Sequence, residues 1–258
     1  METALLPISQ TLFIPLAARA NETKRDNPVL SDAKAVEILQ TMNLENMITD
    51  GGEISTIGIL ARTKVIDEEV GGILSRNPNA VIINLGAGLD TRISRIDNGL
   101  SRWYDLDLPE VIRLRSQYFR ENERVHFLAK SVLDPTWTAE MNIAEGTAVV
   151  IIAEGLLMYF FEEEVRGLFA LLSQRFPGAH MFFDVVHSNF VNKKISSTFT
   201  WGMDKARDIE NQNPNIRLMQ AWSTGDLLKE RQSRLLRILN FIPATRNRSQ
   251  ILHIQFQK

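Results

Sequence analysis

The chain has 258 residues, of which 44% are hydrophobic, and this is typical of a globular protein with a sizeable core. Its net charge of −2 gives no indication of nucleic acid or an anionic membrane as a partner, and no apolar run is long enough to span a bilayer. The sequence contains no cysteine, which excludes disulfides, zinc–thiolate sites and cysteine nucleophiles. With no secretory signal pattern either, we expect a soluble cytoplasmic protein.

The N-terminal part of the chain, up to residue 75, predicts helices. Its first apolar segment is divided by two prolines, and Ser31 or Asp32 can cap the helix that follows. Gly51-Gly52 and Gly71-Gly72 predict breaks. We interpret residues 1–75 as a helical cover that packs on a sheet.

From Ala80 onward, apolar runs that predict strands alternate with helical segments. The predicted strands are Val81–Leu85, Arg102–Leu106, Val125–Ala129, Ala148–Ala153, Met181–Val186 and Ile251–Phe256; the predicted helices are Thr91–Ile96, Pro109–Arg120, Glu162–Phe176 and Leu227–Leu239. This order predicts one α/β domain over residues 76–258, with a parallel Rossmann-like sheet and helices on both faces. Residues 188–224 interrupt the alternation, and we interpret them as an insertion over the strand ends, where ligands of such sheets bind.

A glycine turn, Gly86-Ala87-Gly88, directly follows the first predicted strand. Glycines allow a tight turn and a close approach of the backbone to a ligand, although an ordinary strand–helix corner has the same pattern. The third glycine of the dinucleotide fingerprint is replaced by Thr91, and Asp90 places a negative charge where a pyrophosphate would bind. The turn therefore favours a nucleoside with a cationic group, such as S-adenosylmethionine (SAM), over a nicotinamide dinucleotide.

Three carboxylates follow the predicted strands. Asp105 and Asp107 lie about 20 residues after Gly86, the spacing at which a carboxylate binds ribose hydroxyls, and either could serve because alternate strand residues share a face. Asp105 could instead cap the following helix. Glu154 ends a strongly apolar strand and therefore needs a partner, which the cation of a bound ligand would supply, while Gly155 leaves room for that ligand.

Five motifs occur in an order that resembles the leucine carboxyl methyltransferase family, particularly its bacterial polyketide-type O-methyltransferases. They are Ala61-Arg62-Thr63, Asn84–Arg92, Asp105–Pro109, Ser131–Asp134 and Ala153–Tyr159. The resemblance extends from about Thr3 to the C-terminus. It implies a class I SAM-dependent methyltransferase, with a mostly parallel sheet, an antiparallel last strand and a helical N-terminal cover.

The resemblance also implies a role for each matching residue. Arg62 would pair with the methionine carboxylate of SAM; Gly86, Ala87 and Gly88 would line its methionine and ribose; Asp107, with Asp105, would hold the ribose hydroxyls; Ser131 and Val132 would flank the adenine; and Glu154 would lie beside the methionine part. The protein-methylating branch has an aspartate at the position of Ser131. This difference favours a small-molecule acceptor, with S-adenosylhomocysteine as the second product.

Methyl transfer to a carboxylate or an ionised phenol needs no general base, whereas an alcohol would need one. His187 is the best candidate base, with Asp184 as an alternative, although a histidine after a strand is more often structural. Tyr159 could line the methyl-donor site or simply pack. The other histidines lack metal-ligand spacing, so we predict no metal.

Together these observations predict a SAM-dependent O-methyltransferase that acts on a carboxylate or hydroxyl of a small, aromatic or polyketide metabolite. A catalytically silent SAM-binding or partner-binding protein is the first alternative, and an NAD(P)-dependent oxidoreductase is disfavoured by the glycine turn. The aromatic residues of the predicted insertion could wall an acceptor pocket or pack the insertion on the sheet. They are Phe190, Phe199, Trp201 and Trp222.

Overall fold

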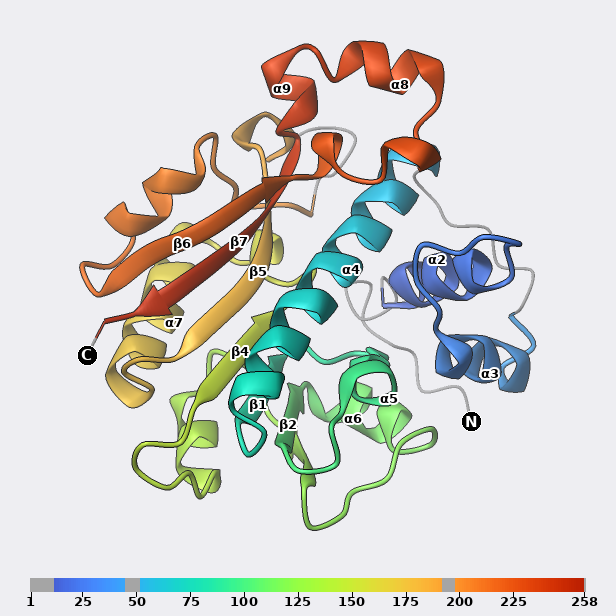
Figure 1. Ribbon diagram of the computed structural model, residues 1–258. Helices are drawn as coiled ribbons and strands as arrows, with labels where there is room; N and C mark the ends of the chain where they lie inside the picture. The colour runs from blue at the N-terminus through green and yellow to red at the C-terminus, as the bar shows by residue number, and fades with distance from the viewer. Residues whose placement is uncertain (1–11, 45–51, 192–197, 258) are drawn as a thin grey trace.

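The computed structural model describes residues 12–44, 52–191 and 198–257, except the side chain of Ala244. The described residues form one seven-stranded sheet, in the order β3-β2-β1-β4-β5-β7-β6 (Figure 1). The strands are β1 (Val81–Leu85), β2 (Arg102–Asp107), β3 (Val125–Ala129), β4 (Val149–Ala153), β5 (His180–Val186), β6 (Ile216–Ser223) and β7 (Ser249–Phe256). Strands β1 to β5 pair in parallel, and β7 is antiparallel to both β5 and β6. The predicted α/β class, with its mostly parallel sheet and antiparallel last strand, is confirmed.

Helices lie on both faces of this sheet. Their bounds are α2 (Phe13–Thr23), α3 (Ala33–Thr41), α4 (Gly52–Arg76), α5 (Arg92–Ile96), α6 (Pro109–Arg115), α7 (Glu162–Arg175), α8 (Arg234–Leu239) and α9 (Pro243–Arg246). Asp32 caps α3 by accepting the backbone N–H of Ala35, as one of the two predicted alternatives required. No helix in the described part of the chain is long and apolar enough to cross a membrane.

Alternate strand residues build two separate apolar layers, as the pleat of a strand requires. Ile83 and Phe183 pack with Phe169 of α7 on one face, whereas Ile82 and Phe182 pack with α4 on the other. Figure 1 shows α4 crossing the front of the sheet, with α7 at its back. Burial of both faces explains why the central strands are apolar without alternation.

Helix α4 contradicts one predicted break. It continues through Gly71-Gly72 to Arg76, because Ile66, Val70 and Ile73 are buried against the sheet and hold the helix despite two poor helix formers. Gly51 of the other predicted break lies outside the described residues, and Gly52 begins the helix with a φ of 63°. The segment after Pro15 was also expected to be broken, but Pro15 fits into the first turn of α2, where its missing N–H costs no helical hydrogen bond.

Two predicted helices are shorter than expected. The helix from Pro109 ends at Arg115 rather than Arg120. The helix predicted from Leu227 is interrupted, because Leu228 adopts a left-handed conformation with a φ of 48°, and α8 begins only after Ser233, whose side chain caps it.

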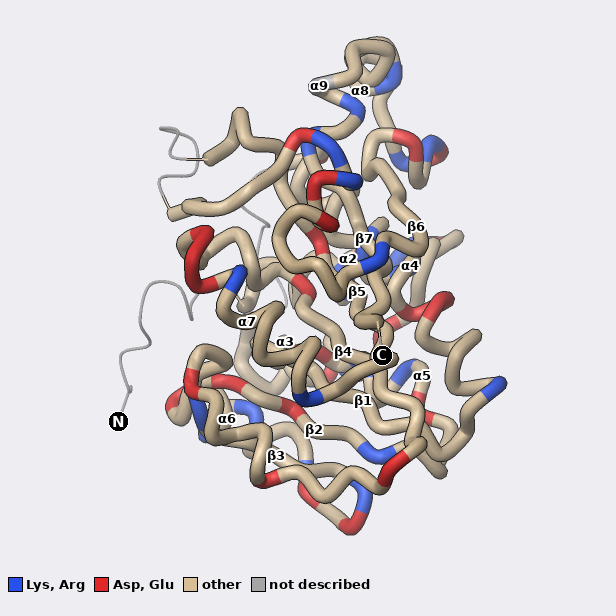
Figure 2. The backbone as a smooth tube through the Cα atoms, turned by 90° about the vertical axis from the view of Figure 1, so that its left-hand side faces the viewer, with Lys and Arg blue, Asp and Glu red and all other residues tan. Residues whose placement is uncertain are grey.

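Strand β6 lies inside the segment that was interpreted as an insertion, and it forms the edge of the sheet beside β7. Only Ile216 of its eight residues is buried, and a register shift between Leu218 and Gln220 disturbs the alternation that would have identified it. The division into a cover over residues 1–75 and a sheet domain over 76–258 stays a prediction. Figures 1 and 2 place α8 and α9 at the end of the molecule farthest from β2 and β3.

Candidate functional site

A cavity of about 600 Å³ lies where the parallel strands β1, β2 and β4 end. Strand β1 is flanked by β2 on one side and β4 on the other, so the cavity occupies the point where the strand order reverses, the usual ligand site of open α/β sheets. Its wall contains nine of the eleven predicted site residues: Arg62, Gly86, Ala87, Gly88, Asp107, Ser131, Val132, Glu154 and Tyr159. The two predicted residues that it lacks are Asp105 and His187.

The glycine turn forms the floor of the cavity. The backbone N–H groups of Gly86 and Ala87 donate to the carbonyl of Leu106 over 2.8 and 3.1 Å, which ties the turn to β2. Gly86 and Gly88 have φ values of 65° and 47°, which favour glycine. A Cβ on Gly86 would lie 2.7 Å from Leu156 Cδ1, so packing against Leu156 also requires glycine at this position.

Asp107 faces the cavity from the end of β2. One of its oxygens accepts the N–H of Gly88 over 2.8 Å, and the other accepts the N–H of Leu108 over 2.7 Å. Burial raises the pKa of Asp107 above its usual value, although these two N–H groups oppose the shift. Each carboxylate oxygen keeps a further lone pair for a ligand hydroxyl.

Asp105 is buried behind the turn and does not line the cavity. It pairs with Arg115, whose Nη2 lies 2.6 Å from Oδ2, and it accepts Asn84 Nδ2 over 3.3 Å. Arg115 in turn donates to the carbonyls of Gly88 and Asp90. The structure therefore corrects both predicted roles of Asp105: it neither faces a ligand nor caps α6, but holds the glycine turn through Arg115.

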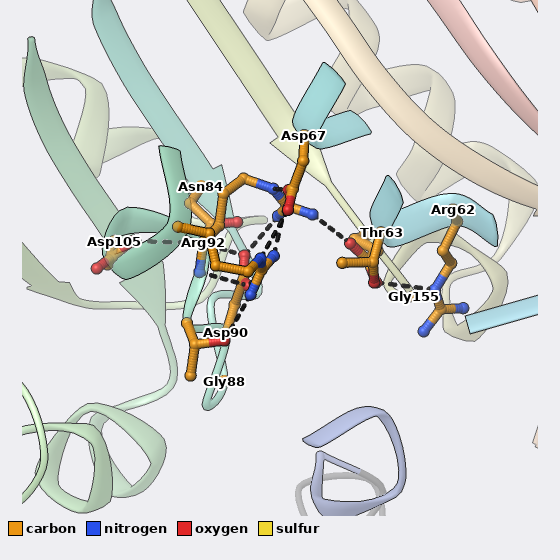
Figure 3. Close-up of polar contacts among 12 residues, drawn as sticks. Arg62, Thr63, Asp67, Asn84, Gly88, Asp90, Arg92, Asp105 and Gly155 are labelled. Atoms are coloured by element: carbon orange, nitrogen blue, oxygen red, sulfur yellow. Dashed lines mark hydrogen bonds and ion pairs between the residues drawn. The ribbon is translucent and has the colours of Figure 1, made fainter. Parts of the chain in front are cut away.

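Glu154 lines the cavity and already has protein partners. Arg62 Nε lies 3.0 Å from Oε1, Thr63 Oγ1 lies 3.2 Å from the same oxygen, and Arg92 Nη2 lies 2.5 Å from Oε2 (Figure 3). Burial alone would raise the pKa of Glu154, but Arg92 and Arg62 outweigh it and lower that pKa. The expectation that a ligand cation is the required partner of Glu154 is therefore wrong, because two arginines of the chain compensate its charge.

Arg62 also contacts Asp184, whose Oδ2 lies 2.9 Å from Nη1. The other oxygen of Asp184 accepts the N–H of Gly155 over 2.5 Å. A Cβ on Gly155 would lie 2.9 Å from Arg62 Nη2, so Gly155 leaves room for this guanidinium rather than directly for a ligand. Asp184, the alternative predicted base, is thus committed to positioning Arg62.

Asp90 lies in the cavity wall beside the turn, and its charge is compensated as well. Arg92 Nη1 lies 2.5 Å from Oδ2, and Asn84 Nδ2 lies 3.2 Å from the same oxygen. Burial would raise the pKa of Asp90, but the surrounding arginines, Arg92 first, lower it strongly. Repulsion of a pyrophosphate by Asp90 is therefore weaker than the sequence suggested.

Most ion-pair partners of Glu154 and Asp90 were not expected from the sequence. Arg92 also binds Asp67 over 2.7 Å, and Arg95 binds Asp67 over 2.6 Å. One signal could have found Asp67: it lies four residues after Thr63 on a single helix, so both side chains share one face, on which Thr63 contacts Glu154 and Asp67 contacts Arg92.

The remaining predicted residues fall into two groups. Of the aromatic residues in the predicted insertion, Phe199 lines the cavity and contacts Tyr159 edge-to-face, whereas Trp201 packs into the core beside Phe169.

His187, the predicted base, lies away from the cavity. Its Nδ1 lies 3.2 Å from Asp204 Oδ1 and accepts the N–H of Asn189. Among the cavity residues that the structure describes, no histidine occurs.

A search for metal-binding groups finds no cluster of three or more acidic or histidine side chains in the described ranges. The acidic residues that surround the cavity are instead interleaved with arginines. Arginine cannot ligate a metal, and its charge repels one. The residues present therefore suit an organic ligand with polar and charged groups, and the absence of a metal stays a prediction.

The cavity and fold can now be compared with known proteins. The family model described as leucine carboxyl methyltransferase matches residues 13–173. The tetracenomycin polyketide synthesis O-methyltransferase TcmP of Streptomyces glaucescens is 29% identical over 233 residues, covering 86% of this chain and 85% of the relative. The S-adenosyl-L-methionine-dependent methyltransferase dpfgK of Gibberella zeae is 30% identical over 247 residues, covering 84% and 82%.

Among solved structures, a DUF574 family protein from Streptomyces avermitilis superimposes with a TM-score of 0.59 at 11% identity, over 94% of this chain and 97% of that one. At such low identity, this likeness shows the fold alone. The sequence relatives and the family model go further, because the relatives cover more than four fifths of the chain and the residues that the family model matches include the turn, Asp107 and Glu154. The chain therefore belongs to the leucine carboxyl methyltransferase family, as its motifs predicted.

Proposed function

We propose that this enzyme is a SAM-dependent O-methyltransferase that transfers a methyl group to an ionised oxygen, preferably a carboxylate, of a small apolar metabolite. The observation that carries the proposal is a single cavity with two kinds of wall. Polar groups from the strand ends and apolar side chains both line it, and the apolar ones include Leu156, Met158, Phe160 and Phe199. Its volume of about 600 Å³ lies within the range usual for cofactor sites, roughly 300–1,000 Å³.

The polar part of the wall matches the groups of SAM. Asp107 has free lone pairs for the ribose hydroxyls, and Ser131 and Val132 lie on the wall where the adenine would follow the ribose. Arg62 would bind the ligand carboxylate, and Glu154 would bind its ammonium group. Arg62 and Glu154 form an ion pair over 3.0 Å, so a zwitterion could bind to the pair without leaving an unpaired buried charge.

The reaction is an in-line displacement in which the acceptor oxygen forms a bond to the methyl carbon as the sulfur–methyl bond breaks. The electron pair of that bond returns to sulfur, which becomes a neutral thioether. Apolar walls exclude water and hold the acceptor near the methyl group, and such positioning alone contributes several orders of magnitude in rate. Charge is neutralised in the transition state, so a dry site favours the reaction.

The state of the carboxylates in the cavity favours an acceptor that arrives ionised. Glu154 and Asp90 are held by arginines, and Asp107 accepts two backbone N–H groups. None of these three is placed as a free general base. A carboxylic acid or acidic phenol, already ionised at neutral pH, needs none. Similarity to TcmP, an O-methyltransferase of tetracenomycin polyketide synthesis, supports a polyketide as the acceptor.

The test combines binding with transfer. Calorimetric titration should show binding of SAM but not of NAD. Labelled SAM should then methylate members of a panel of aromatic carboxylic acids, while their methyl esters, which have no ionised oxygen, should stay unlabelled unless they carry an acidic phenol. NAD binding in place of SAM would refute the cofactor assignment, and SAM binding without transfer to any acceptor would favour the catalytically silent alternative. A cytoplasmic location stays a prediction from composition.

A further inference from the structure

Helices α8 and α9 lie at one end of the molecule (Figures 1 and 2), and the residues of α8 and those that lead into α9 form an exposed apolar surface there. We call it the α8 surface. Its members and their exposed fractions are Leu235 (67%), Ile238 (63%), Leu239 (38%), Phe241 (86%) and Ile242 (53%). Scattered single apolar residues are normal on a protein surface, but five large ones within eight positions are not.

The α8 surface is separate from the face by which α8 packs on the protein. Leu236 is buried against Ile57 and Leu60 of α4, and Asn240, four residues later, donates to the carbonyl of Gly225. Leu235, Ile238 and Leu239 follow the spacing of a different face of α8, and Phe241 and Ile242 lie in the turn between α8 and α9. The exposed side chains are therefore additional to those that attach the helix, and folding of the described chain does not need them to be apolar.

Basic residues surround the α8 surface. Residues 229–246 contain five basic residues and one acidic residue, a charge of +4, whereas the whole chain carries −2. Arg231 pairs with Glu22 of α2 over 2.7 Å, so the other four basic residues are the ones available to a partner. Lys229, Arg234, Arg237 and Arg246 are exposed, and Arg246 has only a loose contact of 3.7 Å with Asp226. Figure 2 shows basic positions in blue beside the labels of α8 and α9, with an acidic position in red nearby. An occupant of this surface must therefore combine an apolar part with negative charge.

We propose that the α8 surface binds an anionic lipid membrane at its interface. Leucine, isoleucine and phenylalanine side chains on a helix flanked by arginines are the composition of interfacial helices, whose apolar face enters the headgroup–acyl boundary. The arginines can keep their guanidinium groups at the level of the phosphates while their stems lie along apolar surface.

Other occupants suit these observations less well. A second copy that met the same surface about a two-fold axis would bring Arg234 and Arg237 close to their own counterparts. The exposed residues of the α8 surface do not line the cavity described above, so they offer no pocket there for an anchoring side chain of an acidic protein partner. Apolar side chains that project from one end of the molecule can insert into a fluid lipid surface without a matching groove.

Membrane docking would also affect access to the cavity. Leu236 and Leu228 pack on Leu60 and Ala61, and Ala61 directly precedes Arg62 of the cavity wall. Docking through α8 therefore holds this end of α4 near the lipid, where an apolar metabolite concentrates. The docking proposal itself does not depend on the proposed function, since it follows from exposure and charge alone.

The experiment is sedimentation of the full chain with vesicles. We expect at least about tenfold stronger binding to phosphatidylcholine vesicles that contain phosphatidylglycerol than to phosphatidylcholine alone, and weaker binding at high salt. The double variant Ile238→Ser, Phe241→Ser should lose at least about tenfold in affinity for the anionic vesicles. The double variant Arg234→Gln, Arg237→Gln should lose most of the difference between the two vesicle types.

Matched controls lie elsewhere on the surface. Leu100→Ser changes an apolar side chain that is 56% exposed, and Arg113→Gln with Arg120→Gln removes two exposed charges. Both controls should bind vesicles like the wild type, and all variants should keep the wild-type SAM affinity in solution because none of these residues lines the cavity. Failure to bind anionic vesicles, or equal binding by every variant, would overturn the proposal. A dimer detected by light scattering and abolished by Ile238→Ser, Phe241→Ser, without lipid binding, would assign the surface to a second copy.

Discussion

Glu154 and Asp107 are carboxylates of one cavity wall, but their neighbours differ. Glu154 lies between Arg62 and Arg92, which lower its pKa against the effect of burial. Asp107 is held by backbone N–H groups, and burial raises its pKa. The charge of Glu154 therefore contributes to a protein network, whereas Asp107 is the carboxylate with capacity left for a neutral hydrogen-bond donor such as a ribose hydroxyl.

Substitution of the two neighbouring aspartates should separate binding from stability. We predict that Asp107→Asn weakens SAM binding about tenfold to a hundredfold, since a charged acceptor of hydrogen bonds contributes about 1.5–3 kcal/mol, with little change in the free energy of unfolding. Asp105→Asn should instead lower the free energy of unfolding by about 3 kcal/mol, because it leaves Arg115 buried without its ion pair. Calorimetry and denaturant titration measure the two quantities. The reverse pattern would exchange the roles assigned to these residues.

His187 provides a test of the catalytic assignment. Its ring contacts Asp204 and the N–H of Asn189 outside the cavity, so His187→Gln should leave kcat/KM within about twofold of the wild type at every pH from 6 to 9. Gln keeps an acceptor for the N–H of Asn189. A loss of more than tenfold in kcat/KM, with SAM affinity unchanged, would restore His187 as the general base.

Sequence patterns identified the lining of the cavity better than the interactions within it. Strand ends could be located from apolar runs, and this placed Asp107 and Glu154 at the correct edge of the sheet. Arg62 and Glu154, however, are 92 residues apart, and no local pattern reports that they meet. Asp105 and Asp107 lie two residues apart at the end of one strand and have the same type of side chain, so the sequence does not distinguish their roles. In the structure, the ion pair with Arg115 identifies Asp105 as the buried one.

At the scale of elements, Asp32 joins three segments of the chain. Its Oδ2 accepts Arg19 Nε of α2 over 2.8 Å, and also the Nη1 of Arg95 in α5 over 2.9 Å. Thr91 Oγ1 donates to the same oxygen over 2.5 Å, while Oδ1 caps α3. The N-terminal helices are thereby attached to the helix that follows the glycine turn.

We predict that Asp32→Asn lowers the free energy of unfolding by about 3 kcal/mol at pH 7, because Arg19 and Arg95 lose their shared buried partner. Burial would raise the pKa of Asp32, but the two arginines lower it below its usual value of 3.8. The ionised carboxylate therefore contributes stability above about pH 4, and this contribution is lost as the pH falls through the lower folded-state pKa. The difference between variant and wild type should thus be constant from pH 5 to 8 and shrink below pH 4.

Urea titrations at a series of pH values measure this difference. Glu37→Gln is a matched control, because Glu37 forms an exposed ion pair with Lys34 and should change the free energy of unfolding by no more than about 0.5 kcal/mol. A pH-independent effect of Asp32→Asn would show that the cap of α3 (an amide oxygen can also serve it) or altered packing dominates, rather than the ion pairs.

The elements themselves were predicted unequally, for a physical reason. Buried strands such as β1 and β4 have apolar runs that their environment requires, and their bounds were predicted to within a residue. Tertiary contacts override local preference elsewhere: packing on the sheet carries α4 through two glycines, and pairing with β7 makes a strand of the exposed segment β6. Such contacts cannot be inferred from the residues of the element alone.

At the scale of the whole molecule, the net charge of the chain does not indicate the charge of its individual segments. A net charge of −2 led to the expectation of no membrane partner, yet residues 229–246 carry +4 beside five exposed apolar side chains. Electrostatic attraction to a surface acts within about 8–10 Å at physiological ionic strength, so a local cluster of charges decides it rather than the total. Only the fold showed which apolar residues of this segment are exposed.

The N-terminal helices and the sheet both contribute residues to the wall of the cavity. Leu12, Pro15 and Arg19 line it together with the glycine turn and Asp107. We therefore predict that SAM stabilises the N-terminal helices and the sheet together. At a concentration of 100 times its Kd, SAM should raise the free energy of unfolding by about 2.7 kcal/mol in a single cooperative transition. Backbone amides of α2 and α3 should become more protected from hydrogen exchange along with those of β1.

Thermal unfolding with and without SAM, followed by mass-resolved hydrogen exchange, measures both effects. NAD at equal concentration and Asp107→Asn with SAM are the controls, and each should reduce the shift. The buried ion pairs of Asp32 with Arg19 and Arg95 are the physical reason to expect one transition, because separation of the helices from the sheet would expose or unpair these charges. Two transitions, of which only the one for residues 76–258 shifts with SAM, would instead make the N-terminal cover an independent domain.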